Sequence, residues 1–191
     1  MRRKDLLVVL TLGAVAIPLG ATMVERLTLE QMVERSERIV QGRCRRTWSA
    51  WDEAHQFIWT HCEMEVADAI KGGAARTLVV SEPGGVVDGM EMTIEGVAHY
   101  QTGEEVVLFL YRTPIGFWRT RGLGQGKYRI RGDSGNDRRV RADLSGVSVL
   151  EPRRAPLGRS TDLRRLDGVS LDEFKATVRA LVARPRQARE N

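Results

Sequence analysis

The chain has 191 residues and two cysteines; 42% of its residues are hydrophobic, 29% are charged, and its formal net charge is +5. This composition is typical of a globular protein of about one domain, and it excludes collagen-like, low-complexity and disulfide-framework classes. The charge is uneven, because residues 1–111 carry a net charge of −5 and residues 112–191 a net charge of +10.

Residues 1–21 have the pattern of a secretory signal peptide. Basic residues at positions 2–4 precede an uncharged stretch over residues 6–24, which ends in small residues. We expect cleavage near Ala21, which would leave a periplasmic or secreted chain with no membrane span. The alternative is a retained membrane anchor, because an uncharged run of this length can just cross a bilayer.

A short helix is predicted over residues 29–36, because Thr28 and Gln31 have the spacing of a capping box. Two strands with alternating apolar and polar residues follow over residues 39–44 and 57–66, joined by a turn at residues 52–54.

This hairpin places Cys44 opposite Cys62 and Thr47 opposite Trp59. Cross-strand cysteines are close enough for a disulfide, and an exported protein meets an oxidising environment. The sequence therefore predicts a Cys44–Cys62 disulfide. The alternative is two buried thiols that act as small core residues.

Shorter strands are predicted downstream, separated by glycine-rich or polar turns. Residues 151–169 have the composition of an exposed basic linker. Ser170 begins a second helix over residues 170–184, since it is followed by an apolar stripe at helical spacing. Residues 185–191 are expected to be a disordered tail. The class is therefore mainly β (α+β), with further strands at residues 76–82, 104–111, 117–120, 127–131 and 138–142 between two helices.

The order of these motifs resembles netrin-like domains and tissue inhibitors of metalloproteinases. The similarity covers residues 28–131: a short helix, Ile-Val-Gln-Gly-Arg at 39–43, a strand that ends in Lys71-Gly72, Gly-Glu-Glu at 103–105 and the glycine-rich segment 122–127. Exported bacterial proteins without an established activity share this order. The resemblance implies a five-stranded OB-like antiparallel barrel over residues 22–150.

The resemblance does not extend to the family's mode of inhibition. Inhibitors of that family clamp a protease zinc with an N-terminal cysteine, and this sequence has no cysteine near Ala21.

No metal site or cofactor is predicted. A zinc site needs three or four converging ligands, and the only histidines are His55, His61 and His99. His61 and Cys62 point to opposite faces of their strand, so they cannot easily share one metal. The segments 122–127 and 132–135 lack the spacing of a phosphate loop and of a nucleophile elbow.

One pattern suggests catalysis. Glu63 and Glu65 share a strand face with His61, and an exported hydrolase using these three residues is the alternative function. The solvated side of a half-buried strand explains the same pattern more simply. We therefore expect a protein that is not an enzyme.

Three tryptophans are candidates for a partner site. Trp48, Trp51 and Trp59 are expected to cluster at one end of the hairpin, where an exposed aromatic patch would bind a partner. Cross-strand packing is the alternative explanation.

A basic cluster is the second candidate partner site. Arg138, Arg139 and Arg141 suit an anionic surface or are simply solvated, and no aromatic residue interleaves with them as in a nucleic-acid groove. Hence no nucleic-acid partner is expected. The sequence as a whole favours an exported, non-catalytic binding module for an envelope or secreted protein, with a protease-inhibitor-like role as one form.

Overall fold

The computed structural model describes residues 24–73, 75–132, 137–143, 149–150 and 166–184. The expected signal peptide, the tail and residues 151–165 of the expected linker lie outside these ranges. Among the residues described, no helix is long and apolar enough to cross a membrane.

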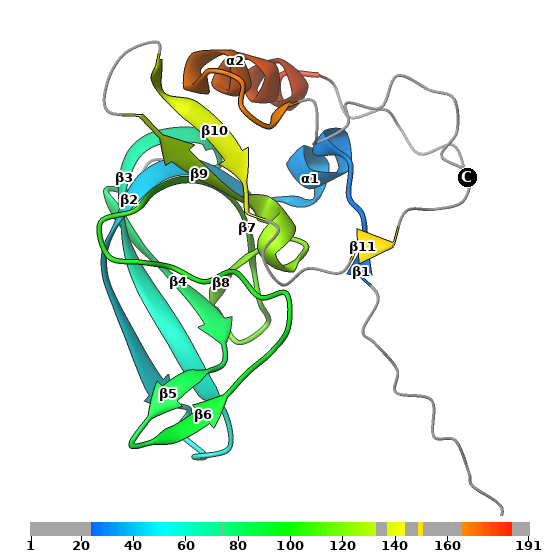
Figure 1. Ribbon diagram of the computed structural model, residues 1–191. Coiled ribbons are helices and arrows are strands. Elements are labelled where there is room, and N and C mark those ends of the chain that lie inside the picture. Colours follow the sequence, from blue (N-terminus) through cyan, green and yellow to red (C-terminus); the bar gives the residue numbers. More distant parts are fainter. Residues whose placement is uncertain (1–23, 74, 133–136, 144–148, 151–165, 185–191) are drawn as a thin grey trace, which may run out of the picture.

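The described part of the chain is mainly β with two α-helices, as predicted (Figure 1). The helices are α1 (Leu29–Arg35), α2 (Leu171–Val182) and the 3-10 helix η1 (Leu123–Gly126). The strands are β1 (Val24–Glu25), β2 (Arg38–Trp51), β3 (Ile58–Lys71), β4 (Thr77–Pro83), β5 (Gly85–Val87), β6 (Met90–Met92), β7 (Glu105–Arg112), β8 (Trp118–Thr120), β9 (Lys127–Arg131), β10 (Arg139–Ala142) and β11 (Val149–Leu150).

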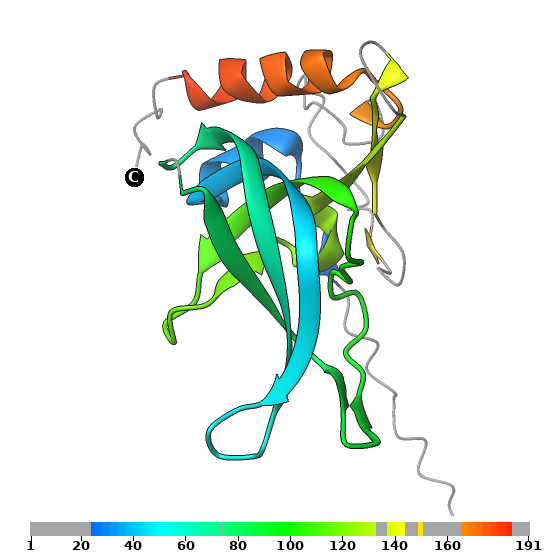
Figure 2. The same cartoon turned by 90° about the vertical axis from the view of Figure 1, so that its left-hand side faces the viewer.

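Seven strands form the main sheet, in the order β10-β9-β7-β2-β3-β4-β8, and β8 also pairs with β7. The strands β7, β2, β3, β4 and β8 are therefore hydrogen-bonded in a ring. All pairs in this ring are antiparallel except β4 and β8, which meet in parallel at Val80 and Trp118. The β2–β3 loop and the β5–β6 hairpin both extend away from the end that carries the helices (Figures 1 and 2).

Both helices begin at the caps predicted for them. The Thr28 hydroxyl accepts a hydrogen bond from the Gln31 amide at 3.2 Å, and the Gln31 side chain accepts one from the Thr28 amide at 2.9 Å, so the first capping box is confirmed. The Ser170 hydroxyl accepts from the Glu173 amide at 3.2 Å. These bonds satisfy backbone donors that a helix start leaves unpaired.

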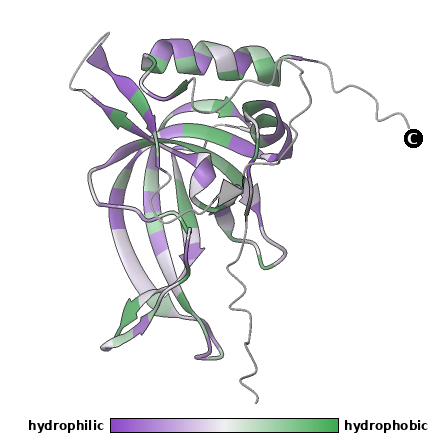
Figure 3. Ribbon diagram, turned by 45° about the vertical axis from the view of Figure 1, so that its right-hand side comes forward, coloured by the Kyte–Doolittle hydropathy of each residue, from purple (hydrophilic) through white to green (hydrophobic). Residues whose placement is uncertain are grey.

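Two hydrophobic clusters form the core. One lies under the helices, where Phe174 of α2 packs on Phe109 and Tyr128 with ring centroids 6.4 and 4.8 Å apart. The other fills the ring and includes Cys44, Cys62 and Met64. Hydrophilic and hydrophobic residues alternate along the long strands (Figure 3), as expected where one face of a strand lines the interior.

The register of the β2–β3 hairpin differs from the prediction. The Asp52 carboxylate accepts hydrogen bonds from the amides of Gln56 and Phe57, so the loop spans residues 52–57 and not 52–54. As a result Cys62 lies opposite Thr47, and Cys44 lies opposite Met64. The prediction that Cys44 lies directly opposite Cys62, and Thr47 directly opposite Trp59, is therefore wrong. Trp59 pairs with Ala50.

The other predicted strands are confirmed as β4 and β7–β10, with ends shifted by a residue or two. The hairpin of β5 and β6 was not predicted. Residues 166–169 differ from the exposed linker expected there, because Leu166 is buried and the Val169 carbonyl accepts a hydrogen bond from Val140.

Candidate functional site

An aromatic cluster covers the outer side of the ring on β2, β3 and β8. Trp48 and His61 are directly opposite each other, and alternation along β3 places Trp59 on the same side as His61. Trp48 and Phe57 are 36% and 41% exposed, and the other rings are half-buried. We call this surface the aromatic face, and its residues are Trp48, Phe57, Trp59, His61 and Phe117.

The rings of the aromatic face pack against one another. Trp48 stacks on His61 with ring centroids 5.2 Å apart. The edge of Phe117 meets both His61, at 5.8 Å, and Trp59, at 5.0 Å, while Phe57 lies 6.1 Å from Trp59. These distances lie within the favourable range for aromatic pairs, so the rings hold each other in place.

Arginines lie on the tryptophans at two sides of the aromatic face. The Arg46 guanidinium is 4.8 Å from the centre of the Trp48 ring, and that of Arg119 is 5.9 Å from the centre of Trp59. Both distances suit a cation–π interaction. Ring surface on each tryptophan is therefore already occupied by a neighbouring side chain.

The same two arginines are paired with carboxylates. The Arg46 Nε lies 2.6 Å from a Glu63 carboxylate oxygen, and the Arg119 Nε lies 3.3 Å from one of Glu82. Arg119 is mostly buried and Glu82 is 2% exposed. The cations beside the aromatic face are thus largely neutralised, and the surface carries little net charge.

His61 connects the aromatic face to β4. Its Nδ1 lies 2.8 Å from the Ser81 hydroxyl, and burial lowers the pKa of the imidazole below its usual value. A lowered pKa favours the neutral ring at pH 7. His61 therefore adds packing surface rather than charge.

Trp51 does not belong to the aromatic face. It is paired with Ile58, and alternation points both to the opposite side of the hairpin from Trp48 and Trp59. Its ring stacks on His55 in the β2–β3 loop, with centroids 6.1 Å apart. The expected cluster of three tryptophans is therefore wrong for Trp51. Alternation along β2 separates Trp51 from Trp48, and the register set by the six-residue loop places Trp59 on the side of Trp48.

Sequence reasoning missed the two phenylalanines. Phe57 continues the alternation of Trp59 and His61 by two residues, which is a signal that the sequence contained. Phe117 had no such signal, because it reaches the aromatic face only when β8 closes the ring beside β4.

The predicted basic cluster lies elsewhere, on and beside β10. Arg138 contacts the Glu105 carboxylate, Arg139 donates to the Gly168 carbonyl at 3.3 Å, and Arg141 lies 3.2 Å from an Asp167 oxygen. Arg139 and Arg141 thus hold residues 167–168 beside β10, and Arg138 connects the start of β10 to β7. An anionic partner for them stays a prediction.

The residues of the hydrolase alternative lie on the outer face of β3, where both glutamates are paired with arginines. Glu63 is paired with Arg46, and Glu65 lies 3.1 Å from Arg45. The pocket at this end of the molecule is on the other side of β3 and is lined by neither glutamate nor by His61. Within the described ranges, no group of three or more histidine, cysteine or acidic residues is placed to hold a metal ion.

The two cysteines lie together inside the ring as free thiols. Their sulfur atoms are 2.6 Å apart. They meet because Cys44 lies diagonally across the hairpin from Cys62, next to a shift in the strand register at Arg45. Burial raises the pKa of both thiols. A raised pKa disfavours the reactive thiolate, so this pair is unsuited to redox catalysis in the folded state.

Comparisons of the chain with protein-family models, with curated proteins and with solved structures find no match.

Proposed function

We propose that this chain is an exported, non-catalytic binding module that docks a protein of the cell envelope or the secreted fraction on its aromatic face. The proposal rests on one observation: five interlocked rings, flanked by two neutralised arginines, remain partly exposed on the outside of the ring of strands. The pattern of residues 1–21 supports export.

The topology supports an OB-like barrel as the scaffold. Strands β2, β3 and β4 follow one another, and β7 returns after a long connection to lie beside β2, which is a Greek-key order. Strand β8 then pairs with β7 and β4 and completes a ring of five. A five-stranded, partly open Greek-key barrel is the OB architecture, so the order of strands favours the resemblance to netrin-like domains.

The chemistry of the aromatic face favours a protein partner. Trp and Arg are enriched at the centres of protein interfaces, where a few such residues carry most of the binding energy. Rings that are already packed lose little side-chain entropy on binding. A single-stranded nucleic acid needs open ring faces and unpaired cations, and here the rings contact each other while Arg46 and Arg119 are ion-paired.

The geometry gives the hydrolase alternative less support. Catalytic carboxylates are expected in a concave site with perturbed surroundings, whereas Glu63 and Glu65 lie on an open strand face beside arginines. A protease-inhibitor-like role is one form of the binding proposal, and its partner would be an exported protease.

The test compares tryptophans on the two sides of the hairpin. The exported chain is used to capture partners from an envelope and secreted extract, and the affinity for the purified partner is then measured by calorimetry. We expect Trp59→Ala to weaken binding by about 30-fold or more, the range of an interface hot spot. Trp51→Ala is the matched control and should bind like the wild type.

Two results would contradict the proposal. One is equal binding by Trp59→Ala and the wild type, provided that thermal melts show both to be folded. The other is an absence of any captured protein under mild, low-salt washing.

A further inference from the structure

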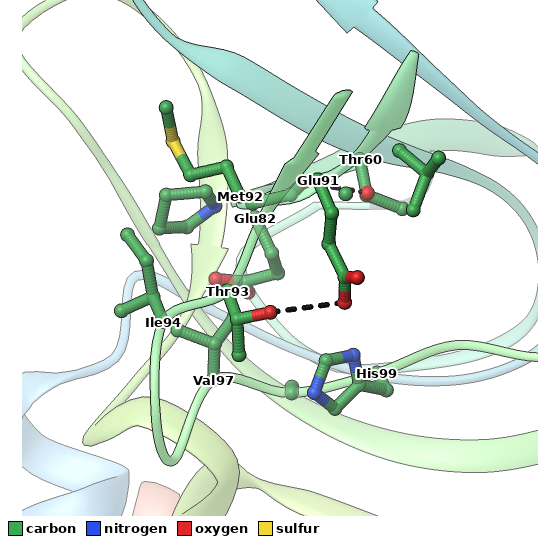
Figure 4. Close-up of a pocket in the computed structure, with 13 residues that line it drawn as sticks. Thr60, Glu82, Glu91, Met92, Thr93, Ile94, Val97 and His99 are labelled. Carbon is green, nitrogen blue, oxygen red and sulfur yellow. Dashed lines mark hydrogen bonds between the residues drawn. The ribbon is translucent and has the colours of Figure 1, made fainter. Parts of the chain in front are cut away.

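A pocket of about 220 Å³ lies beside the β5–β6 hairpin, on the opposite side of β3 from the aromatic face. It is formed by the end of β4, by β5 and β6 and by residues 93–99 (Figure 4). Thr60 of β3 contributes to its wall, and alternation separates Thr60 from Trp59 and His61. This pocket therefore lies on a different side of β3 from the proposed docking surface, although Glu82, the ion-pair partner of Arg119, lines it.

Glycine makes the close approach of β5 possible. Gly85 has a φ of 138°, and a Cβ atom there would overlap the hydroxyls of Ser49 and Thr60. These hydroxyls bond to each other at 2.9 Å, and Thr60 donates to the Gly84 carbonyl at 2.7 Å. The hydroxyls of Ser49 and Thr60 thus already have hydrogen-bond partners within the protein. Binding of a ligand in the pocket must depend on the other side chains that line it.

Two carboxylates in the pocket have different surroundings. Glu82 is buried and accepts hydrogen bonds from the Thr120 amide at 2.7 Å and from Arg119 at 3.3 Å, so its charge is compensated. Glu91 is exposed, and within the described ranges its carboxylate accepts a hydrogen bond from the Thr93 hydroxyl alone, at 3.1 Å. Among the described residues no cation pairs with Glu91.

The walls around these carboxylates are mostly apolar. Pro83, Met92, Ile94 and Val97 line the pocket, and the His99 ring lies on the same side as Glu91 (Figure 4). The pocket thus combines mostly apolar walls with a carboxylate that no cation of the described residues pairs with. An anion would be repelled by the Glu91 carboxylate, and a neutral apolar ligand would form no charge-assisted hydrogen bond with it.

We propose that this pocket binds an alkylammonium or alkylguanidinium group, from a lysine or arginine side chain of a partner or from a small free amine. The alkyl part would pack on the apolar walls, and the cation would form a charge-assisted hydrogen bond with Glu91. The volume equals that of about seven water molecules at ~30 Å³ each, enough for such a chain but less than the ~300 Å³ of a typical drug-sized site.

The test is a titration followed by amide chemical shifts of the full exported chain. The probes are n-butylammonium chloride, its neutral analogue 1-butanol, and the blocked tripeptide acetyl-Gly-Lys-Gly-amide. We expect saturable shifts around Gly84 and Gly85 with the cations and none with butanol. Glu91→Gln should weaken cation binding at least about tenfold, as expected for loss of a charged hydrogen bond.

Glu95→Gln is the matched control, since Glu95 is exposed on the same segment but does not line the pocket. Tighter binding of the tripeptide than of butylammonium identifies a partner's side chain as the ligand, and the reverse order identifies a free amine. The proposal is overturned if butanol binds as well as butylammonium, if Glu91→Gln binds like Glu95→Gln, or if no shift saturates.

Discussion

Oxidation of Cys44 and Cys62 to a disulfide should stabilise the fold. In this step the two thiols lose two protons and two electrons to a thiol–disulfide oxidant such as oxidised glutathione, and one S–S bond forms. The sulfurs are already paired, so little movement of β2 and β3 is needed.

The size of the effect follows from the length of the closed loop. Residues 44–62 form a loop of 19 residues. In the chain-entropy model, closing a loop of this length in the unfolded chain raises the free energy of unfolding by about 3 kcal/mol. For a protein of 150–250 residues this corresponds to a rise in Tm of about 6–12 °C.

The assay compares thermal melts of oxidised protein with and without a phosphine reductant, after confirming the bond by mass spectrometry. The double variant Cys44→Ala/Cys62→Ala is the control and should melt at the same temperature in both conditions. The reasoning is refuted if denatured, oxidised protein still shows two alkylatable thiols, or if the reductant leaves the Tm unchanged. Either result would favour the alternative of two buried thiols.

Two further predictions concern buried groups that hold elements together. Burial raises the pKa of Glu82 above its ordinary 4.5, so its favourable contribution is complete below about pH 4.5 and is lost as the pH rises through the folded pKa. Urea titrations at pH 4 and pH 7, roughly at and above the unfolded pKa, give the free energy of unfolding of the wild type and of Glu82→Gln. The difference in favour of the wild type should be smaller at pH 7 than at pH 4. A difference that grows with pH would contradict this. Phe174→Ala should lower the free energy of unfolding by about 3–5 kcal/mol, because the fully buried ring leaves a cavity against Phe109 and Tyr128. Thr177 is half-buried on α2, and its hydroxyl bonds to the Glu173 carbonyl of the same helix. Thr177→Ala should change the free energy of unfolding by less than about 0.5 kcal/mol, and equal effects of the two variants would contradict the packing argument.

The positions of the helices and of most strands were predictable because their signals are local. Thr28 and Ser170 lie where a hydroxyl can cap a helix start, and both do so. Alternation identified β2 and β3, and glycine-rich or polar turns delimited the shorter strands that follow. Caps and alternation act within a few residues, so one sequence is enough to detect them.

The pairing of residues across the hairpin was not predictable in the same way. A carboxylate at Asp52 bonds two amides and lengthens the loop, and an irregularity at Arg45 shifts the register again. Each change moves every later cross-strand pair. The tertiary structure therefore decided that Trp59 shares a face with Trp48 and not with Trp51, and that Cys44 meets Cys62 diagonally.

Contacts between distant segments also depended on the tertiary structure. Lys127 has the sequence context of an ordinary strand residue, yet its side chain is fully buried between Glu104, at 2.8 Å, and Asp143, at 3.3 Å. Phe117 reaches Trp59 only because β8 pairs with both β4 and β7. The sequence by itself determined which segments become helix or strand, since those choices depend on neighbouring residues. Closure of the ring decided which side chains form the aromatic face and the pocket, since those contacts join residues far apart in the chain.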